Sequence, residues 1–390
     1  MRIILNPASS EEYDIRMLSS LSKALEELGH QTILLKKQFK NRELLEFIKS
    51  DKDVLFQVNQ FTNFNLRSRY PHIKIVSWFQ DIFPSISQSI ENFNLTENDL
   101  FYTLGDPKVL GFNNTKKLYV KPFYSGADFK QAISMEKKYD FSMVGSILPA
   151  PSGSRFFQRG EISIRQLTIM YIKQLLKPIF LILKKKKNRN FFKIVEQNYE
   201  FLNGSLDIGA LENIMKIEGA PERAVDFLCR EYPRILDRYN LINLALKVSD
   251  NLILAGSGYN SYKNFQKFSL GLIKDQKKIE KIFYSSKINL TNNTHGLALH
   301  SRVIECMACE GFVMSHNSPR DNTHGGFLKN FEEGKHFAFY DKNNFSESVS
   351  KYLKDEKLRI NIGKEAKKII LAEHSWKKRA EELLSDLKQV

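Results

Sequence analysis

Residues 286–317, with the sequence SKINLTNNTHGLALHSRVIECMACEGFVMSHN, constrain the fold of this chain more than any other stretch. Residues 286–290 alternate in polarity as a half-buried strand does, and the polar residues 291–296 favour a turn. A helical pattern begins at about Leu299, Gly311 stands where a residue that ends a helix is expected, and a buried strand follows. This order predicts an open α/β sheet with the polar loop at the carboxyl end of a strand, where such sheets bind ligands.

The helix in this stretch carries two charged residues that are candidates for a ligand site. With about 100° of rotation per residue, the apolar stripe that would pack on the sheet contains Val303, Ile304, Met307 and Ala308. The opposite side contains Arg302, Glu305 and Cys309. A guanidinium can bind a phosphate through two hydrogen bonds, and a carboxylate can accept hydrogen bonds from a vicinal diol. The alternative is a solvated ion pair on the helix surface, which the same spacing also produces.

Turns that contain glycine and polar residues extend this candidate site. The loop before the helix contains Asn292, Asn293 and His295. A strand at 139–144 is followed by Gly145 and Ser146, and a strand at 251–255 is followed by Gly256 and Gly258. Glycine in such turns lets a phosphate approach backbone N–H groups. A complete dinucleotide fingerprint would have a third glycine at position 261, where this chain has Ser261, so a tight β-α turn remains the alternative.

The first 127 residues alternate strands with helices, which indicates parallel β-α-β units and a Rossmann-like domain, 1–127. Strands are expected at 2–5, 31–35, 53–58, 72–79, 99–105 and 118–123, with helices at 14–28 and 41–50. Asp81 follows the fourth of these strands and is the candidate for a catalytic base beside a cleft. Its alternative role is to form a turn before Pro84.

A second Rossmann-like domain is expected at 139–370, with a helical insertion at about 150–245 and a C-terminal helix at 371–390. The insertion contains LTIMYIKQLLKPIFLILKKKKNR at 167–189, an apolar segment that ends in lysines and an arginine. A basic amphipathic segment of this kind can dock on an anionic membrane surface. The alternative is a helix that packs on its own domain with the lysines in solvent.

The formal charge of +15 and the pI near 9.4 imply an acidic partner, whether nucleic acid, an anionic membrane or phosphorylated substrates. The basic stretches lack the interleaved aromatic residues of single-strand binders, so nucleic acid is not expected. The chain begins directly with a strand and has no apolar run long enough to span a membrane, and three cysteines fit a reducing compartment. We therefore expect a cytoplasmic protein that is peripheral at the inner face of the membrane.

The pair Cys306-x-x-Cys309 has no partner motif that would complete a zinc site, and it lies near the end of its helix, where the dipole disfavours a thiolate. Both cysteines are therefore expected to be packing residues. The sequence also has no H-E-x-x-H motif, no nucleophile elbow and no P-loop. Neither a metal nor a cofactor is expected.

The stretch RVIECMACEGFV at 302–313 resembles the signature of the CgeB-like group of glycosyltransferases, a branch of the group 1 superfamily with the two-domain GT-B fold. Further stretches match in the same order: YDFSMVGS at 139–146, NLILAGSGY at 251–259, YSSKINL at 284–290, EEGKHFAFY at 332–340 and EHSWKKRAEELL at 373–384. The resemblance covers most of 139–390. It implies two Rossmann-like domains that face a cleft, with the last helix crossing back to the first domain.

The resemblance also implies transfer of a sugar from a nucleotide-diphosphate sugar. Departure of the diphosphate concentrates negative charge, which positive side chains and helix N-termini must stabilise when no metal takes part. Arg302 is the expected diphosphate ligand, helped by backbone near Gly145, Gly256 and Gly258. By resemblance, Glu305 corresponds to the glutamate that binds the ribose hydroxyls.

Many such enzymes have a second glutamate eight residues earlier, where this chain has Leu297. Asn292, Asn293 and His295 are therefore the candidates to contact the donor sugar. The sequence predicts a metal-independent GT-B glycosyltransferase with Asp81 and His295 as catalytic candidates. Its acceptor would be a cell-envelope or surface polysaccharide, a glycolipid or a protein. Two alternatives remain open: a nucleotide-sugar epimerase on the same fold, and a non-catalytic binder of RNA or anionic membrane.

Overall fold

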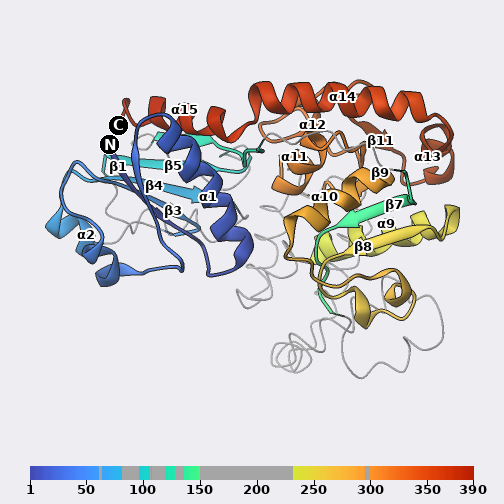
Figure 1. The fold of residues 1–390 in the computed structure, drawn as a ribbon, viewed down its shortest axis with the longest axis horizontal. Coiled ribbons are helices and arrows are strands. Elements are labelled where there is room, and N and C mark those ends of the chain that lie inside the picture. Colours follow the sequence, from blue (N-terminus) through green and yellow to red (C-terminus); the bar gives the residue numbers. More distant parts are fainter. Residues whose placement is uncertain are drawn as a thin grey trace, which may run out of the picture.

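The computed structural model describes residues 1–60, 64–80, 96–105, 107, 119–128, 136–149, 232–294 and 299–390. These residues form two parallel sheets, each with helices packed on it (Figure 1). The predicted fold class of two Rossmann-like α/β domains is therefore confirmed. The helical basic insertion predicted for the second domain lies almost entirely outside the described residues, and so does the segment 167–189.

The first domain contains a six-stranded parallel sheet in the order β2-β1-β3-β4-β5-β6. The strands are β1 (Arg2–Asn6), β2 (Gln31–Leu34), β3 (Val54–Val58), β4 (Lys74–Phe79), β5 (Asp99–Thr103) and β6 (Tyr119–Pro122). All six strands predicted for this part of the chain are present. The helices are α1 (Glu12–Glu27) and the short α2 (Phe64–Arg69).

The helix predicted at 41–50 is only a short 3₁₀ helix, η1 (Asn41–Glu46). Backbone groups just beyond it bind side chains instead of continuing a helix. The carbonyl oxygen of Phe47 accepts a hydrogen bond from Arg2 (2.6 Å), and the N–H of Lys49 donates to Asp53 Oδ2 (2.7 Å). The Arg2–Asp53 ion pair thus anchors this turn at the amino end of β1 and β3.

The core of the first domain is built around stacked aromatic rings. Tyr102 of β5 stacks on Phe123 with 4.1 Å between ring centroids, and Trp78 of β4 meets Phe123 edge-on at 5.3 Å. These side chains are fully buried. Aromatic pairs at such distances add to the hydrophobic stabilisation of a sheet. Helix α1 covers the same face through Leu18, Leu21 and other apolar residues of one cluster.

The second domain contains a five-stranded parallel sheet in the order β11-β10-β9-β7-β8. The strands are β7 (Tyr139–Val144), β8 (Leu252–Ala255), β9 (Ser286–Thr291), β10 (Val313–His316) and β11 (Ala338–Tyr340). Its helices are α9 (Tyr232–Val248), α10 (Gln276–Ser285), α11 (Ser301–Ala308), α12 (Phe327–Asn330), α13 (Phe345–Lys354) and α14 (Glu356–Glu373), with 3₁₀ turns η5 (Tyr259–Ser261) and η6 (Gln266–Phe268).

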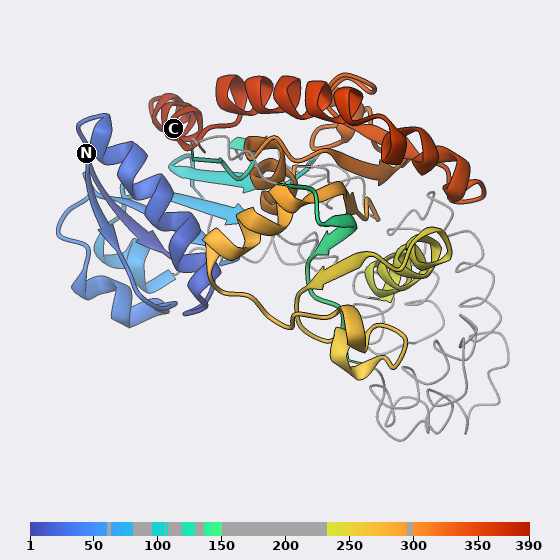
Figure 2. The same ribbon diagram turned by 45° about the vertical axis from the view of Figure 1, so that its right-hand side comes forward.

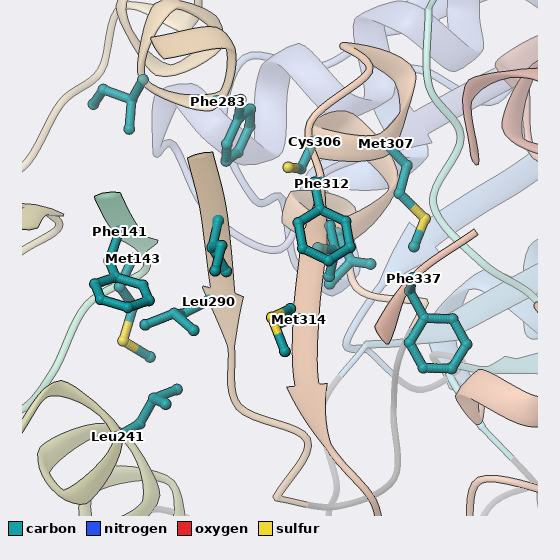
Figure 3. Packing of buried hydrophobic residues seen from close by; sticks show 14 of the residues in the cluster. Phe141, Met143, Leu241, Phe283, Leu290, Cys306, Met307, Phe312, Met314 and Phe337 are labelled. Atoms are coloured by element: carbon teal, nitrogen blue, oxygen red, sulfur yellow. The ribbon is translucent and has the colours of Figure 1, made fainter. Parts of the chain in front are cut away.

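The segment 286–317 forms the predicted strand, loop, helix and strand, with β9 in the middle of the sheet. Leu290 of β9 lies beside Met143 of β7, and Met314 of β10 and Met307 of α11 belong to the same buried cluster (Figure 3). The apolar stripe of α11 is therefore the buried one, as predicted.

The end of α11 differs from the prediction in two ways. Cys309 does not face away from the core but is fully buried, with Tyr284 of α10 beside it. The left-handed residue is Glu310 (φ 59°), not Gly311. Gly311 donates its N–H to the Cys306 carbonyl oxygen (2.9 Å), and a Cβ on Gly311 would collide with the Cys306 sulfur. Glycine is therefore required at 311 for close packing.

The last two helices connect the domains. Helix α14 runs along the second domain, and α15 (Trp376–Asp386) packs beside α1 on the first, as both views show (Figures 1 and 2). At the crossover, the Ala127 N–H donates to the His374 carbonyl oxygen (2.9 Å) and the Trp376 N–H donates to the Ala127 carbonyl oxygen (3.2 Å). Within α15, buried Asp386 accepts hydrogen bonds from Tyr102 (2.7 Å) and Tyr119 (3.0 Å). The chain's end is thus part of the first domain's core.

Among the helices in the described ranges, none has the length and apolar character required to cross a membrane.

Candidate active site

A cavity of about 770 Å³ lies between the two domains. Its walls come from the carboxyl ends of strands in both sheets and from the first turns of α1 and α11. The first domain contributes Ala8, Glu11, Glu12, Tyr13, Asp14, Arg16, Asn59 and Gln80, among others. The second contributes Gly145, Ser146, Arg234, Arg238, Ser257, Ser301, Arg302 and Glu305, among others. A cavity of this size and position can hold a nucleotide or a sugar nucleotide.

Arg302 lies in the first turn of α11 and lines the cavity, as its position on the helix predicted. With the residues that the structure describes, its guanidinium makes no hydrogen bond and no ion pair. Burial lowers the pKa of Arg302 well below its usual range, and the nearby guanidiniums of Arg238 and Arg234 lower it further. An arginine stays charged even so, which gives this wall of the cavity a positive charge.

Arg238 of α9 is a site residue that sequence reasoning missed. It is buried, its Nε donates to Asn292 Oδ1 (2.9 Å), and Nη1 donates to the carbonyl oxygen of Ser146. Arg234 lies one turn earlier on α9 and also lines the cavity. The spacing of four residues, which puts both arginines on one face of a helix, could have indicated a basic site. Their proximity to the strand at 139–144 could not be predicted, because a long segment separates that strand from α9 in sequence.

Gly145 makes room for these arginines. A Cβ on Gly145 would lie 3.1 Å from Arg302 Nη1 and 3.5 Å from Arg238 Cζ, and its φ of 143° also favours glycine. Glycine at 145 therefore has a structural reason that differs from the predicted approach of a phosphate to the backbone: a side chain here would crowd both guanidiniums.

Gly256 and Gly258 serve loop packing. A Cβ on Gly256 would collide with the Gly145 carbonyl oxygen, and one on Gly258 would collide with that of Ile147. The Gly256 N–H donates to Gly271 (2.8 Å), and the Ser257 N–H donates to Ser146 Oγ (3.1 Å). The tight-turn alternative thus accounts for Gly256 and Gly258. The N–H groups of Gly256 and Ser257 already donate to protein acceptors.

Asn292 and Asn293 do not belong to the cavity wall, and their side chains hold neighbouring residues in place. Asn292 fixes Arg238, as described above, and its Nδ2 donates to Thr294 (2.7 Å). Asn293 is buried and donates to Asp321 Oδ1 (2.7 Å). Both amides thus hold arginine and loop positions, and their predicted contact with the donor sugar stays a prediction.

Glu305 lines the cavity and forms an ion pair with a residue of the first domain. Its Oε1 accepts a hydrogen bond from Arg16 of α1 (3.2 Å), and on the same two helices Tyr13 donates to Ser301 Oγ (2.7 Å). These contacts bring the first turns of α1 and α11 together across the cavity. Sequence patterns could not show this, because residues 13 and 301 are 288 positions apart.

Asp81, His295 and Leu297 lie outside the described residues. On the first-domain wall, the described residues include the carboxylates Glu11, Glu12 and Asp14. Asp14 is partly buried and accepts a hydrogen bond from Ser9 Oγ (2.6 Å). In the described ranges, no three His, Cys, Asp or Glu side chains gather as a metal site would require. Cys306 and Cys309 are buried, and burial raises the pKa of the Cys306 thiol.

Residues 235–385 match the model of the glycosyl transferase-like family. A match to the whole chain comes from a glycosyltransferase of Rickettsia africae ESF-5, with 12% identity, a TM-score of 0.52 and 97% of that chain covered. Anabaena Alr3699/HepE, in complex with UDP-glucose, has 11% identity and a TM-score of 0.53, with both chains covered fully. Sucrose-phosphate synthase of Thermosynechococcus elongatus has 10% identity and a TM-score of 0.50. The match covers 98% of that chain and 100% of this one.

No curated protein shows a significant match to the sequence. At these identities the solved structures show a shared fold, that of the GT-B glycosyltransferases. The family match is to residues 235–385, and the likeness in fold extends over both Rossmann-like domains.

Proposed function

We propose that the protein transfers a sugar from a nucleoside diphosphate sugar to a cell-envelope or surface polysaccharide, a glycolipid or a protein. One observation carries this proposal: a charged guanidinium, that of Arg302, lines an inter-domain cavity without an anionic partner among the described residues. Diphosphate is the anion that a sugar nucleotide brings to such a cleft. Its two negative phosphates would relieve the repulsion between Arg302 and its arginine neighbours.

The arginines would also promote the reaction itself. As the bond between the sugar and the diphosphate breaks, negative charge grows on the leaving phosphate oxygen. Donors that are already aimed at this oxygen stabilise the transition state more than the ground state. Arg238 is held in place by Asn292 and by the Ser146 carbonyl oxygen, so it would need little reorganisation. We therefore propose that the reaction proceeds without a metal, with Arg302 and Arg238 supplying the positive charge.

Glu305 would bind the ribose of the donor. A carboxylate offers about four acceptor positions, so Glu305 can accept from Arg16 and from a vicinal diol at the same time. Ribose binding would then occur where the two domains already touch. This arrangement supports a donor that lies across the N-terminal end of α11.

The first donor nucleotide to test is UDP, because one structural relative is in complex with UDP-glucose. An inverting reaction requires a base on the acceptor side of the cavity. We keep Asp81 as a candidate for this base and add Asp14, a carboxylate on the first-domain wall. His295 stays a candidate for contact with the donor sugar. We place the protein in the cytoplasm, with residues 167–189 at the inner face of the membrane.

The decisive experiment is a thermal-shift panel of the full chain with UDP, GDP, dTDP, CMP and ADP. One nucleoside diphosphate should raise the melting temperature, because a ligand that binds only the folded state stabilises it. Arg302→Ala and Glu305→Ala should each abolish the shift. If no nucleotide shifts the transition, or if both variants respond like the wild type, the proposed donor site is wrong.

A further inference from the structure

The segment 263–278, between η5 and the first turns of α10, exposes two leucines among lysines. Leu270 and Leu272 are 52% and 59% exposed. The segment contains five lysines, all exposed: Lys263, Lys267, Lys274, Lys277 and Lys278. Its single acidic residue, Asp275, accepts a hydrogen bond from the Lys277 N–H (2.9 Å) as the N-cap of α10. Five positive charges and one negative charge leave a net charge of +4 on these residues.

The backbone that carries the leucines is fixed to the sheet. The Leu270 N–H donates to the Leu254 carbonyl oxygen of β8 (2.8 Å), and the Gly271 carbonyl oxygen accepts from Gly256 (2.8 Å). Gly271, with a φ of 69°, makes the turn between the two leucines. The apolar side chains are therefore presented by a hydrogen-bonded turn, and their exposure is a property of the fold.

The same segment forms part of the cavity wall. Leu272, Ile273 and Lys274 line the cavity together with Gln276 of α10. In Figure 2 this part of the chain, in gold and orange, leads from the end of β8 to α10 along the lower side of the second domain. Whatever surface binds Leu270 and the lysines would therefore lie at the mouth of the cavity.

We propose that residues 263–278 dock the protein on an anionic lipid bilayer. Leucine side chains can enter the boundary between headgroups and acyl chains, while lysines bind the phosphates of anionic lipids. Exposed leucines flanked by lysines on one short turn match this layered chemistry, which a nucleic acid or a purely polar glycan does not offer. This docking surface uses residues other than 167–189 and does not depend on the donor site. Joined to the proposed function, it would hold the cavity beside an acceptor in the membrane.

Tryptophan fluorescence can test this contact at a single position. Trp78 is fully buried and Trp376 is 6% exposed, so the emission of both native tryptophans should respond little to vesicles. Leu270→Trp should emit as an exposed tryptophan in buffer and shift to shorter wavelength with vesicles of phosphatidylglycerol and phosphatidylcholine. Ile360→Trp, at a site on α14 that is 41% exposed, is the control and should not shift. The proposal is overturned if Leu270→Trp shows no shift, shifts no more than the control, or already emits as a buried residue in buffer.

Vesicle sedimentation of the full chain gives a second readout. Leu270→Ser combined with Lys267→Glu should weaken binding to the anionic vesicles at least about ten-fold, because it removes an apolar contact and reverses a charge. The matched control, Ile360→Ser with Lys364→Glu on α14, should bind like the wild type. The proposal is contradicted if both double variants lose vesicle binding equally, or if Leu270→Ser with Lys267→Glu loses none. Neither Leu270 nor Lys267 lines the cavity, so nucleotide-induced stabilisation should persist in the first pair. If nucleotide stabilised none of the variants, the proposed donor site would be wrong, and the proposed membrane contact would be unaffected.

Discussion

Arg302 passes so close to Gly145 that a Cβ on the glycine would lie 3.1 Å from its Nη1. Because Gly145 has no side chain, Arg302 of α11 can approach the backbone at the end of β7. The guanidinium that we assign to the diphosphate thus occupies space that any other residue at 145 would restrict.

Gly145→Ala should weaken nucleotide binding about ten-fold and lower stability by about 1–2 kcal/mol, since alanine is strained at this φ and crowds Arg302. Calorimetric titration and denaturant unfolding would measure the two effects. The matched control is Gly29→Ala, which also has a positive φ (83°) but no atom within 4 Å of an added Cβ. The control should lose stability and keep its nucleotide affinity. Unchanged affinity in Gly145→Ala would show that the guanidinium does not need this space.

Arg302→Ala should separate stability from binding. Burial and its neighbouring arginines lower the pKa of Arg302, so the charged form is disfavoured in the folded protein. Removing it should leave the melting temperature of the free protein unchanged or higher. Nucleotide affinity should fall by about 2–3 kcal/mol, the effect of losing charge-assisted hydrogen bonds to a phosphate. Arg69→Ala, an exposed arginine on the first domain, should change neither quantity. A large loss of stability without nucleotide would instead assign Arg302 a structural role.

Gly363→Ala tests the contact between α14 and the end of α11. Alanine is favoured over glycine inside a helix by about 1 kcal/mol, but a Cβ on Gly363 would collide with the carbonyl oxygen of Glu310. The collision should dominate and destabilise the protein by about 1–3 kcal/mol, as overpacking does. Lys364→Ala on the exposed side of the same helix should have little effect. Stabilisation of the Gly363 variant in urea unfolding would rule out the tight packing described for this helix pair.

His374, at the crossover between α14 and α15, should make stability depend on pH. Burial lowers its pKa to about 3, and Arg379 contributes in the same direction. In the unfolded chain its pKa is about 6.5, so the unfolded state binds a proton first as the pH falls. Stability should therefore decrease below about pH 6.5 by up to about 1.4 kcal/mol per pH unit from this residue, until the pH nears the folded value.

Denaturant unfolding at pH 7.5 and pH 5.5 would measure this effect. His374→Phe should lose less stability than the wild type over this interval, because phenylalanine takes up no proton and fits beside Tyr124 and Phe331. His72→Gln, at an exposed site, is the control and should follow the wild type. An identical loss in His374→Phe would mean that other groups determine the acid sensitivity.

The sequence predicted the elements that depend on local pattern. Short apolar runs between turn residues predicted the strands of the first sheet and β7 to β10, and helical periodicity placed Arg302 on the cavity side of α11. It placed Cys309 on the side opposite the apolar stripe, but Cys309 is fully buried beside Tyr284 of α10, in the packing role that was predicted for it. Arg238 escaped notice because 92 positions separate it from the Ser146 carbonyl oxygen that it binds. The pairing of Arg16 with Glu305 depends on how two domains meet, which no periodicity encodes.

The position of α15 has a consequence for biosynthesis. Trp376, Ala380 and Leu383 complete the apolar cluster that α1 and the first sheet begin, so the first domain lacks a piece of its own interior until these residues are synthesised. Domains usually form in the order in which they are made, but the first domain must wait until residues 376–387, which follow the second domain in sequence, emerge from the ribosome. A variant truncated before residue 376 would leave the apolar cluster of the first domain open, and a chaperone would find its binding surface there.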